Sequence, residues 1–260
     1  MPKFNANLSM MFTEVDFLER FGAAARAGFR GVEFLFPYEY PAATIKEQLD
    51  KHKLSMVLFN MPPGDWASGE RGLACDPARV SQFQENVGKA LEYAKALECG
   101  MLHCMAGLKP RGVSEEKMRE TYIANLQFAG KELAKHHITL LIEAINTRDI
   151  PGFYLNYSRQ AFDIMHYANV PNLAFQYDIY HMQIMEGDLA PTIEKHRARI
   201  AHFQLADNPG RNEPGTGEIN YPFLFDFIDR LGYDGWIGCE YKPKTRTDDG
   251  LGWIRPCLKG

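Results

Sequence analysis

Eight short apolar runs recur along the chain, and each is followed by turn residues and then by a segment with helical periodicity. Most of these runs are apolar almost throughout, which is typical of parallel strands covered on both faces. Strict alternation of such strands with helices predicts an α/β fold built on a parallel sheet. The runs cover residues 4–10, 31–35, 54–60, 101–105, 138–144, 173–177, 200–205 and 236–240.

Amphipathic segments lie between these runs, with apolar residues on one helical face. The helix expected over residues 115–134 has the clearest start, because Ser114 can cap it and two acidic residues follow at once. A weaker candidate lies at 43–51. The other expected helices cover residues 14–27, 80–98, 158–168, 190–197 and 221–231.

The number and size of the strand–helix units favour a closed barrel. Eight units in 260 residues average about 32 residues each, which suits a (β/α)₈ TIM barrel. An open doubly wound sheet is the alternative, but it usually carries a glycine-rich phosphate turn after its first strand, and residues 10–13 contain no glycine. We therefore expect one barrel domain across residues 1–260.

Composition excludes several other classes of protein. The balance of 29 Lys and Arg against 33 Asp and Glu leaves a net charge of −4, so no basic surplus indicates a nucleic-acid groove. No apolar run approaches the roughly 20 residues needed to cross a bilayer, and residues 1–7 lack the apolar core of a secretory signal. The five cysteines are scattered and form no CxxC pair, which indicates reduced thiols. We expect a cytoplasmic protein that binds neither nucleic acid nor membrane.

Polar side chains stand at the carboxyl ends of four successive runs. In a barrel these ends are neighbours at one rim, where barrel active sites lie. Three carboxylates and an amide oxygen would offer the hard oxygen ligands that suit Mg²⁺ or Mn²⁺, and crowded anions repel one another unless a cation lies among them. One acidic residue at such a place is usually a helix cap or a loop salt bridge, but four polar residues at the same end of successive runs predict a shared site. The four residues are Glu143, Asp178, Gln204 and Glu240.

Further candidates lie in the segments that follow the runs. His181 could bind substrate or be a packed, hydrogen-bonded histidine. Arg211, in the irregular stretch 206–220, could clamp a substrate carboxylate or be solvated. Lys109 and Lys242, just beyond the fourth and eighth runs, could bind an anionic substrate or face solvent.

The longest irregular stretch, residues 61–77, follows the third run, and a loop of this length inside a compact domain is often functional. Its side chains Trp66, Glu70 and Arg71 could close over a ligand or form a surface patch. Glu33, on the second run, could face the same pocket or bind a neighbouring amide.

Six motifs spread from the first strand to the last resemble the hydroxypyruvate isomerases of the xylose-isomerase-like barrel superfamily. This resemblance implies metal ligands at the four strand-end residues, Glu143 and Glu240 as paired catalytic carboxylates, and substrate contacts from His181 and Arg211. Related ketose 3-epimerases usually have a histidine where this chain has Gln204. The motifs are NLSM at 7–10, GVEF at 31–34, GDW at 64–66, YDIYH at 177–181, GTGEINY at 215–221 and GWIGCEYKP at 235–243.

The chemistry that the resemblance implies is the interconversion of hydroxypyruvate and tartronate semialdehyde by proton transfer through an enediolate, with Mg²⁺ or Mn²⁺ as cofactor. The substrate would be a small 2-oxo or hydroxy acid whose carboxylate Arg211 or Lys109 neutralises. Alternatives are an isomerase of a four-carbon 2-oxo acid, a ketose 3-epimerase, a dehydratase on the same scaffold, and a non-catalytic sugar-acid binding protein. Relatives are commonly oligomers, and Trp253 is a candidate contact in a homo-oligomer.

Overall fold

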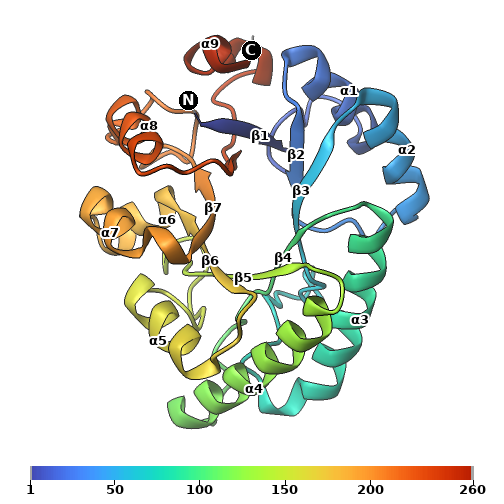
Figure 1. Ribbon diagram of the computed structural model, residues 1–260, viewed down its shortest axis with the longest axis vertical. Coiled ribbons are helices and arrows are strands. Elements are labelled where there is room, and N and C mark those ends of the chain that lie inside the picture. The colour runs from blue at the N-terminus through green and yellow to red at the C-terminus, as the bar shows by residue number, and fades with distance from the viewer. Residues whose placement is uncertain (1, 259–260) are drawn as a thin grey trace.

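The computed structural model describes residues 2–258. Within this range eight parallel strands pair in chain order and β1 also pairs with β8, so the sheet closes on itself as a single (β/α)₈ barrel (Figure 1). The predicted TIM barrel is confirmed. The strands are β1 (Lys3–Asn7), β2 (Gly31–Phe34), β3 (Ser55–Asn60), β4 (Met101–His103), β5 (Thr139–Glu143), β6 (Leu173–Asp178), β7 (Ile200–Leu205) and β8 (Trp236–Cys239).

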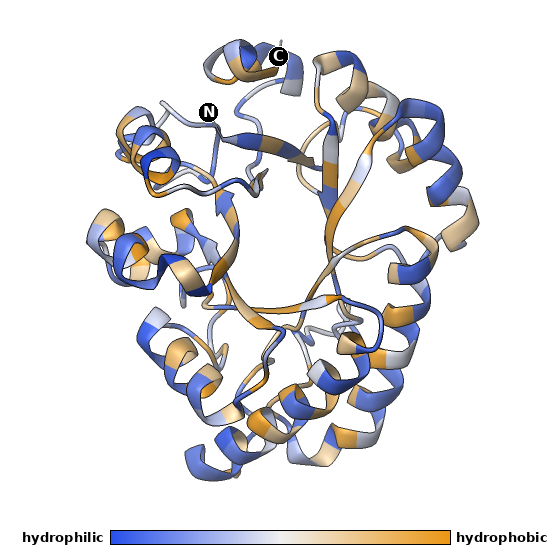
Figure 2. Ribbon diagram, viewed as in Figure 1, coloured by the Kyte–Doolittle hydropathy of each residue, from blue (hydrophilic) through white to orange (hydrophobic). Residues whose placement is uncertain are grey.

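Helices surround the strands as an outer ring (Figure 1). Each of the longer helices carries both apolar and polar residues, as expected where one face packs on the barrel and the other meets solvent (Figure 2). None of the helices in residues 2–258 combines the length and apolarity needed to cross a membrane. The helices are α1 (Phe17–Ala27), α2 (Ala42–His52), α3 (Val80–Ala96), α4 (Glu115–Ala134), α5 (Ser158–Ala168), α6 (Ile179–Met185), α7 (Leu189–His196), α8 (Tyr221–Arg230) and α9 (Arg255–Leu258), with 3₁₀ turns at Pro77–Arg79, Arg197–Arg199 and Thr247–Trp253.

Most of the predicted elements agree closely with these bounds. The ranges 115–134 and 158–168 coincide with α4 and α5, and the weaker candidate at 43–51 is the helix α2. The first strand was predicted too long, because β1 ends at Asn7 and the chain then turns. Helix α6 was not predicted, since it follows β6 directly without a loop to mark its start.

Two register shifts alter the barrel near the carboxyl ends of its strands. One lies between Val32 and Glu33 in the β2–β3 pair, and the other between Phe175 and Gln176 in the β6–β7 pair. The extra residue lies on β3 in the first pair and on β7 in the second. Such irregularities are frequent beside active sites, and Glu33 and Gln176, which stand next to them, are both buried and polar.

Trp253 packs within its own chain. Its ring centroid lies 5.5 Å from that of Phe4 and 5.7 Å from that of Phe225. Packing of this kind is the simpler of the two interpretations that the sequence left open for this residue. A homo-oligomer stays a prediction.

Candidate active site

A cavity of about 500 Å³ opens at the carboxyl ends of the strands, the rim at which barrel active sites lie. Seven of the residues that the sequence singled out line it. They come from strand ends, from the first turn of α6 and from the loops after β3, β7 and β8, so distant parts of the chain meet here. These residues are Trp66, Arg71, Glu143, His181, Arg211, Glu240 and Lys242.

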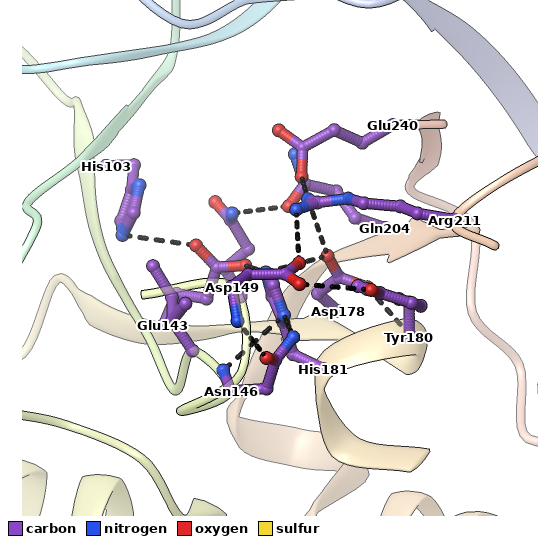
Figure 3. Close-up of polar contacts among 12 residues, drawn as sticks. His103, Glu143, Asn146, Asp149, Asp178, Tyr180, His181, Gln204, Arg211 and Glu240 are labelled. Atoms are coloured by element: carbon purple, nitrogen blue, oxygen red, sulfur yellow. Dashed lines mark hydrogen bonds and ion pairs between the residues drawn. The ribbon is translucent and has the colours of Figure 1, made fainter. Parts of the chain in front are cut away.

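The acidic side chains form one compact cluster beside this cavity. Glu143, Asp178, His181 and Glu240 each offer an atom, and these atoms all lie within 4.8 Å of one another (Figure 3). Glu143 ends β5, Asp178 ends β6 and Glu240 directly follows β8. All four residues are buried. The three carboxylates therefore converge as strand order led us to expect.

Gln204 lies next to this cluster on β7, paired in register with Asp178. Its side chain extends toward Glu143 and Glu240 (Figure 3). Its Nε2 donates to Glu33 Oε1 at 2.7 Å, and its Oε1 accepts from Gln176 Nε2 at 2.5 Å. The amide is thus held from both sides.

Burial and mutual repulsion make the cluster hold protons more tightly. Burial, together with the charges of Glu240 and Asp178, raises the pKa of Glu143 well above its ordinary value. Burial also raises the pKa of Asp178 to about 6 and that of Glu240 to about 8, although Arg211 opposes both shifts. Without a cation among them, these carboxylates share protons near neutral pH.

Arg211 places a permanent positive charge against the cluster. One of its terminal nitrogens lies 2.8 Å from Glu240 Oε2 and 3.8 Å from Asp178 Oδ2, and the other donates to Asp149 Oδ2 at 3.0 Å. Burial would lower the pKa of Arg211, but the neighbouring carboxylates raise it above its ordinary value. The backbone φ of Arg211 is 53°, in the left-handed region that residues with side chains seldom adopt. The loop after β7 therefore holds a strained conformation that directs this side chain into the cavity.

Two neutral histidines flank Glu143. His181 Nδ1 accepts from the side-chain Nδ2 of Asn146 at 2.6 Å, so its proton lies on Nε2. That Nε2 lies 3.9 Å from Glu143 Oε1 and 3.5 Å from Asp178 Oδ2, and His103 Nε2 lies 3.6 Å from Glu143 Oε2. Burial lowers the pKa of His103 to about 3 and that of His181 well below its ordinary value. Both rings therefore stay uncharged. His181 can donate a hydrogen bond from Nε2 without adding charge, whereas His103 carries its proton on Nδ1, which donates to Asn60 Oδ1 at 3.1 Å.

The donor set fits a divalent cation. Among the described residues, Glu143 Oε1 and Asp178 Oδ2 are buried and have no hydrogen-bond partner. Buried acceptors without partners are costly, and both oxygens belong to the same cluster. A cation that prefers oxygen ligands would satisfy both and relieve the repulsion among the carboxylates.

Two of the predicted substrate contacts lie outside the cavity. Lys109 Nζ is 3.6 Å from Glu115 Oε2, and Glu70 forms an ion pair with Arg79. Both charges are compensated elsewhere on the protein, and neither residue lines the cavity. The structure therefore does not support contact of either residue with a substrate.

Several polar residues of the site were not singled out from the sequence. His103 ends β4, so the rule that polar residues at strand ends are candidates would have found it, but the predicted run 101–105 placed it inside a strand. Gln176 lies inside β6 and not at its end, so the same rule would not have found it. Asn146 and Asp149 lie in the loop after β5, and a single sequence carries no signal for them.

A family model described as "Xylose isomerase-like TIM barrel" matches residues 21–257. The chain belongs to this family of barrels. It is 51% identical to a hydroxypyruvate isomerase of Escherichia coli over 256 residues, which cover 98% of this chain and 99% of the relative. It is also 51% identical to a 2-oxo-tetronate isomerase of Cupriavidus necator over 258 residues, 99% of both chains.

Solved structures agree on the fold. A Brucella melitensis protein titled "AP endonuclease, family 2" superposes with a TM-score of 0.97 at 50% identity, covering 98% of this chain and 99% of that chain. A D-allulose 3-epimerase of Methylomonas sp. in complex with D-allulose gives a TM-score of 0.75 at 21% identity, covering 100% and 91%. At that identity the second likeness concerns the fold alone.

Proposed function

We propose that this chain is an enzyme that isomerises a small 2-oxo acid, interconverting hydroxypyruvate and tartronate semialdehyde by proton transfer. The observation that carries this proposal is the pair of buried carboxylates, Glu143 and Glu240, that line one cavity and belong to one oxygen-rich cluster. Relatives matched over nearly their full length are named hydroxypyruvate isomerase and 2-oxo-tetronate isomerase, which supports the substrate class.

The residues proposed to hold a divalent metal, Mg²⁺ or Mn²⁺, are the four at the strand ends. When bound, the metal would withdraw electron density from the substrate oxygens and so acidify the neighbouring C–H bond. Oxygen ligands favour these hard cations over zinc. The proposed ligands are Glu143, Asp178, Gln204 and Glu240.

The two glutamates would move the proton. One carboxylate removes the C–H proton of hydroxypyruvate, and a proton returns to the adjacent carbon from the carboxyl group of the other. The hydroxyl proton moves from the oxygen on the first carbon to the oxygen on the second, so that the ketone becomes a hydroxyl and the hydroxymethyl group an aldehyde. Burial raises the pKa of Glu143 and Glu240, which makes their ionised forms stronger bases than an exposed glutamate. The Nε2–H of His181 would donate a hydrogen bond to a substrate oxygen.

The substrate's own carboxylate needs a positive partner that is not already neutralised. Arg211 contacts carboxylates of the protein on two sides. Arg71 and Lys242 also line the cavity, and no ion pair joins either of them to an acidic side chain among the described residues. The guanidinium of Arg71 lies 3.8 Å from the ring of Trp66, which fixes its position. We assign the substrate carboxylate to Arg71 and Lys242.

We expect Lys242→Met to raise KM for hydroxypyruvate by about tenfold with little change in kcat, the effect of losing one charge-assisted hydrogen bond. Lys244→Met is the matched control, because Lys244 is also exposed but does not line the cavity. Steady-state kinetics on the two variants and on Arg71→Met make the comparison. An unchanged KM in both Lys242→Met and Arg71→Met would show that the carboxylate binds elsewhere.

The stability of the chelator-treated protein should fall as pH rises from about 6.5 to about 8.5. The pKa of Glu240 is raised to about 8 and that of Glu143 well above its ordinary value. Stabilisation from such raised groups is complete below the unfolded pKa and is lost as pH passes the folded pKa. Thermal unfolding across this range should therefore show a falling Tm.

Added Mn²⁺ should raise Tm more at the upper end of this range than at the lower end, because protons compete with the metal for the same oxygens. Differential scanning fluorimetry with and without Mn²⁺ measures both effects. A Tm that climbs with pH in chelator and does not respond to Mn²⁺ at either pH would contradict the metal site.

The choice between a three-carbon and a four-carbon substrate is tested directly by kinetics. A relative of equal identity is named 2-oxo-tetronate isomerase, so that acid is the second candidate substrate. We expect a higher kcat/KM for hydroxypyruvate than for 2-oxo-tetronate with the Mn²⁺-loaded protein. Turnover of 2-oxo-tetronate alone would replace the three-carbon assignment, and turnover of neither acid would overturn the proposed reaction.

A further inference from the structure

A buried polar network adjoins the acidic cluster and is centred on Glu33 of β2, which is 1% exposed. Burial would raise the pKa of Glu33, but the attraction of His202 and the hydrogen bonds to its carboxylate lower it below the ordinary value. Glu33 is therefore a fixed negative charge inside the barrel. Its carboxylate accepts from Asn5 Nδ2 at 2.8 Å, Asn7 Nδ2 at 3.1 Å, His202 Nε2 at 2.8 Å and Gln204 Nε2 at 2.7 Å.

The backbone leaves room for this carboxylate. On β8, a Cβ atom built onto Gly238 would collide with the Glu33 carboxylate, so only glycine leaves room for it there. A glycine on one strand thus accommodates the charged group of another.

The orientation of the Gln204 amide is set by Glu33. An amide placed among carboxylates turns its NH₂ toward one of them, because the N–H groups donate to anions. Here Nε2 donates to Glu33, outside the cluster, and Oε1 accepts from Gln176. Gln176 also hydrogen-bonds Glu143, which places the carbonyl of Gln204 on the side of the cluster.

We propose that Glu33 is a positioning residue that fixes the Gln204 amide so that its carbonyl oxygen is presented to a cation held by the carboxylate cluster. A carbonyl oxygen that faces carboxylates is unfavourable until a cation lies between them. Glu33 offsets this unfavourable energy before the cation binds, because it accepts a hydrogen bond from the amide Nε2. This role rests on the metal site of the proposed function.

Asn7 connects Glu33 to the carboxylate of Glu240 in the same way. Its Nδ2 lies 3.1 Å from Glu33 Oε1 and 3.2 Å from Glu240 Oε1, so it joins the two. Glu33 therefore supports Gln204 directly and Glu240 through one amide, without lining the cavity itself.

The test is a titration of the purified, chelator-treated protein with Mn²⁺ alone, followed by electron paramagnetic resonance of the free ion. We expect Glu33→Gln to raise the Kd for Mn²⁺ at least about tenfold, as is typical when a group that orients a metal ligand is lost. Asn5→Ala is the matched control, because Asn5 also donates to Glu33 but contacts neither Gln204 nor the cluster through the hydrogen bonds of the described residues. Its Tm should fall while its Kd stays within about threefold of the wild-type value.

The double variant Glu33→Gln/Gln204→Glu separates orientation from simple damage. This variant exchanges the carboxylate and the amide that form the hydrogen bond between positions 33 and 204. The amide at position 33 then donates to the carboxylate at position 204, and that carboxylate faces the cation. We expect Mn²⁺ affinity to return to within about threefold of wild type. If Glu33→Gln alone does not fold, the double variant still tests the positioning role of Glu33. Weak Mn²⁺ binding by the folded double variant would overturn that role.

Wild-type affinity in Glu33→Gln, or an equal loss in Asn5→Ala, would also overturn the positioning role while leaving the proposed metal site intact. A wild-type protein that binds no Mn²⁺ would instead overturn the metal site itself, and the role of Glu33 with it. The two failures are therefore distinct.

Discussion

Glu143→Gln is expected to lower kcat for hydroxypyruvate by at least ~10²-fold, the lower end of what general acid–base catalysis contributes. Glu143 lies at the end of β5 and lines the cavity, so its carboxylate is placed to take a proton from a bound substrate. An amide of nearly the same shape cannot accept that proton, whereas it can fill the same space. The fold should therefore survive.

Steady-state kinetics at saturating Mn²⁺ measure this effect, so that weaker metal binding does not imitate the loss of a base. Glu115→Gln is the matched control, because Glu115 lies on the exposed first turn of α4 and pairs with Lys109 outside the cavity. Circular dichroism establishes that both variants are folded. A kcat close to wild type in folded Glu143→Gln would remove Glu143 from the proton transfer.

Glu240→Gln should lower kcat at least as much as Glu143→Gln does, by ~10²-fold or more, because it removes the second carboxylate of the pair. It also removes the anion that holds Arg211 at 2.8 Å. We therefore expect KM to change as well, in contrast to Glu143, which forms no direct ion pair with an arginine among the described residues. The same assay measures both constants. Near-normal turnover in Glu143→Gln and Glu240→Gln together would refute the assignment of the proton transfer to this pair.

The barrel could be predicted because its determinants are local and repeated. Each strand is a nearly continuous apolar run, and each helix has one apolar face, so their alternation can be read without long-range information. The bounds that were wrong lie where the chain turns without a change in hydropathy. After β1 the apolar character continues into a turn, and α6 begins at Ile179, directly after β6 ends at Asp178.

The site was predictable where strand geometry determines it. Glu143, Asp178 and Glu240 stand at strand ends, and the closing of the barrel fixes their direction and brings them together. Residues in loops have no such constraint. Arg211 reaches the cluster through a left-handed backbone conformation, and Lys109 turns to an acidic residue on α4 instead.

The residues behind the cluster could not be read from one sequence because their partners are distant along the chain. Glu33 was left open between facing the pocket and binding a neighbouring amide, and the structure shows that it binds amides, one of which belongs to Gln204. Its partners come from β1 and β7, and its space depends on Gly238 of β8. Neither is visible until the strands are paired.

The most direct test of the central claim is proton NMR of the reaction in D₂O, with hydroxypyruvate and the Mn²⁺-loaded protein. If Glu143 and Glu240 remove and return protons, tartronate semialdehyde should carry solvent deuterium on the carbon that receives the proton, and chelator should abolish its formation until Mn²⁺ is restored. Product that forms without deuterium on that carbon, at a rate indifferent to chelator, would contradict both the proton transfer and the metal site.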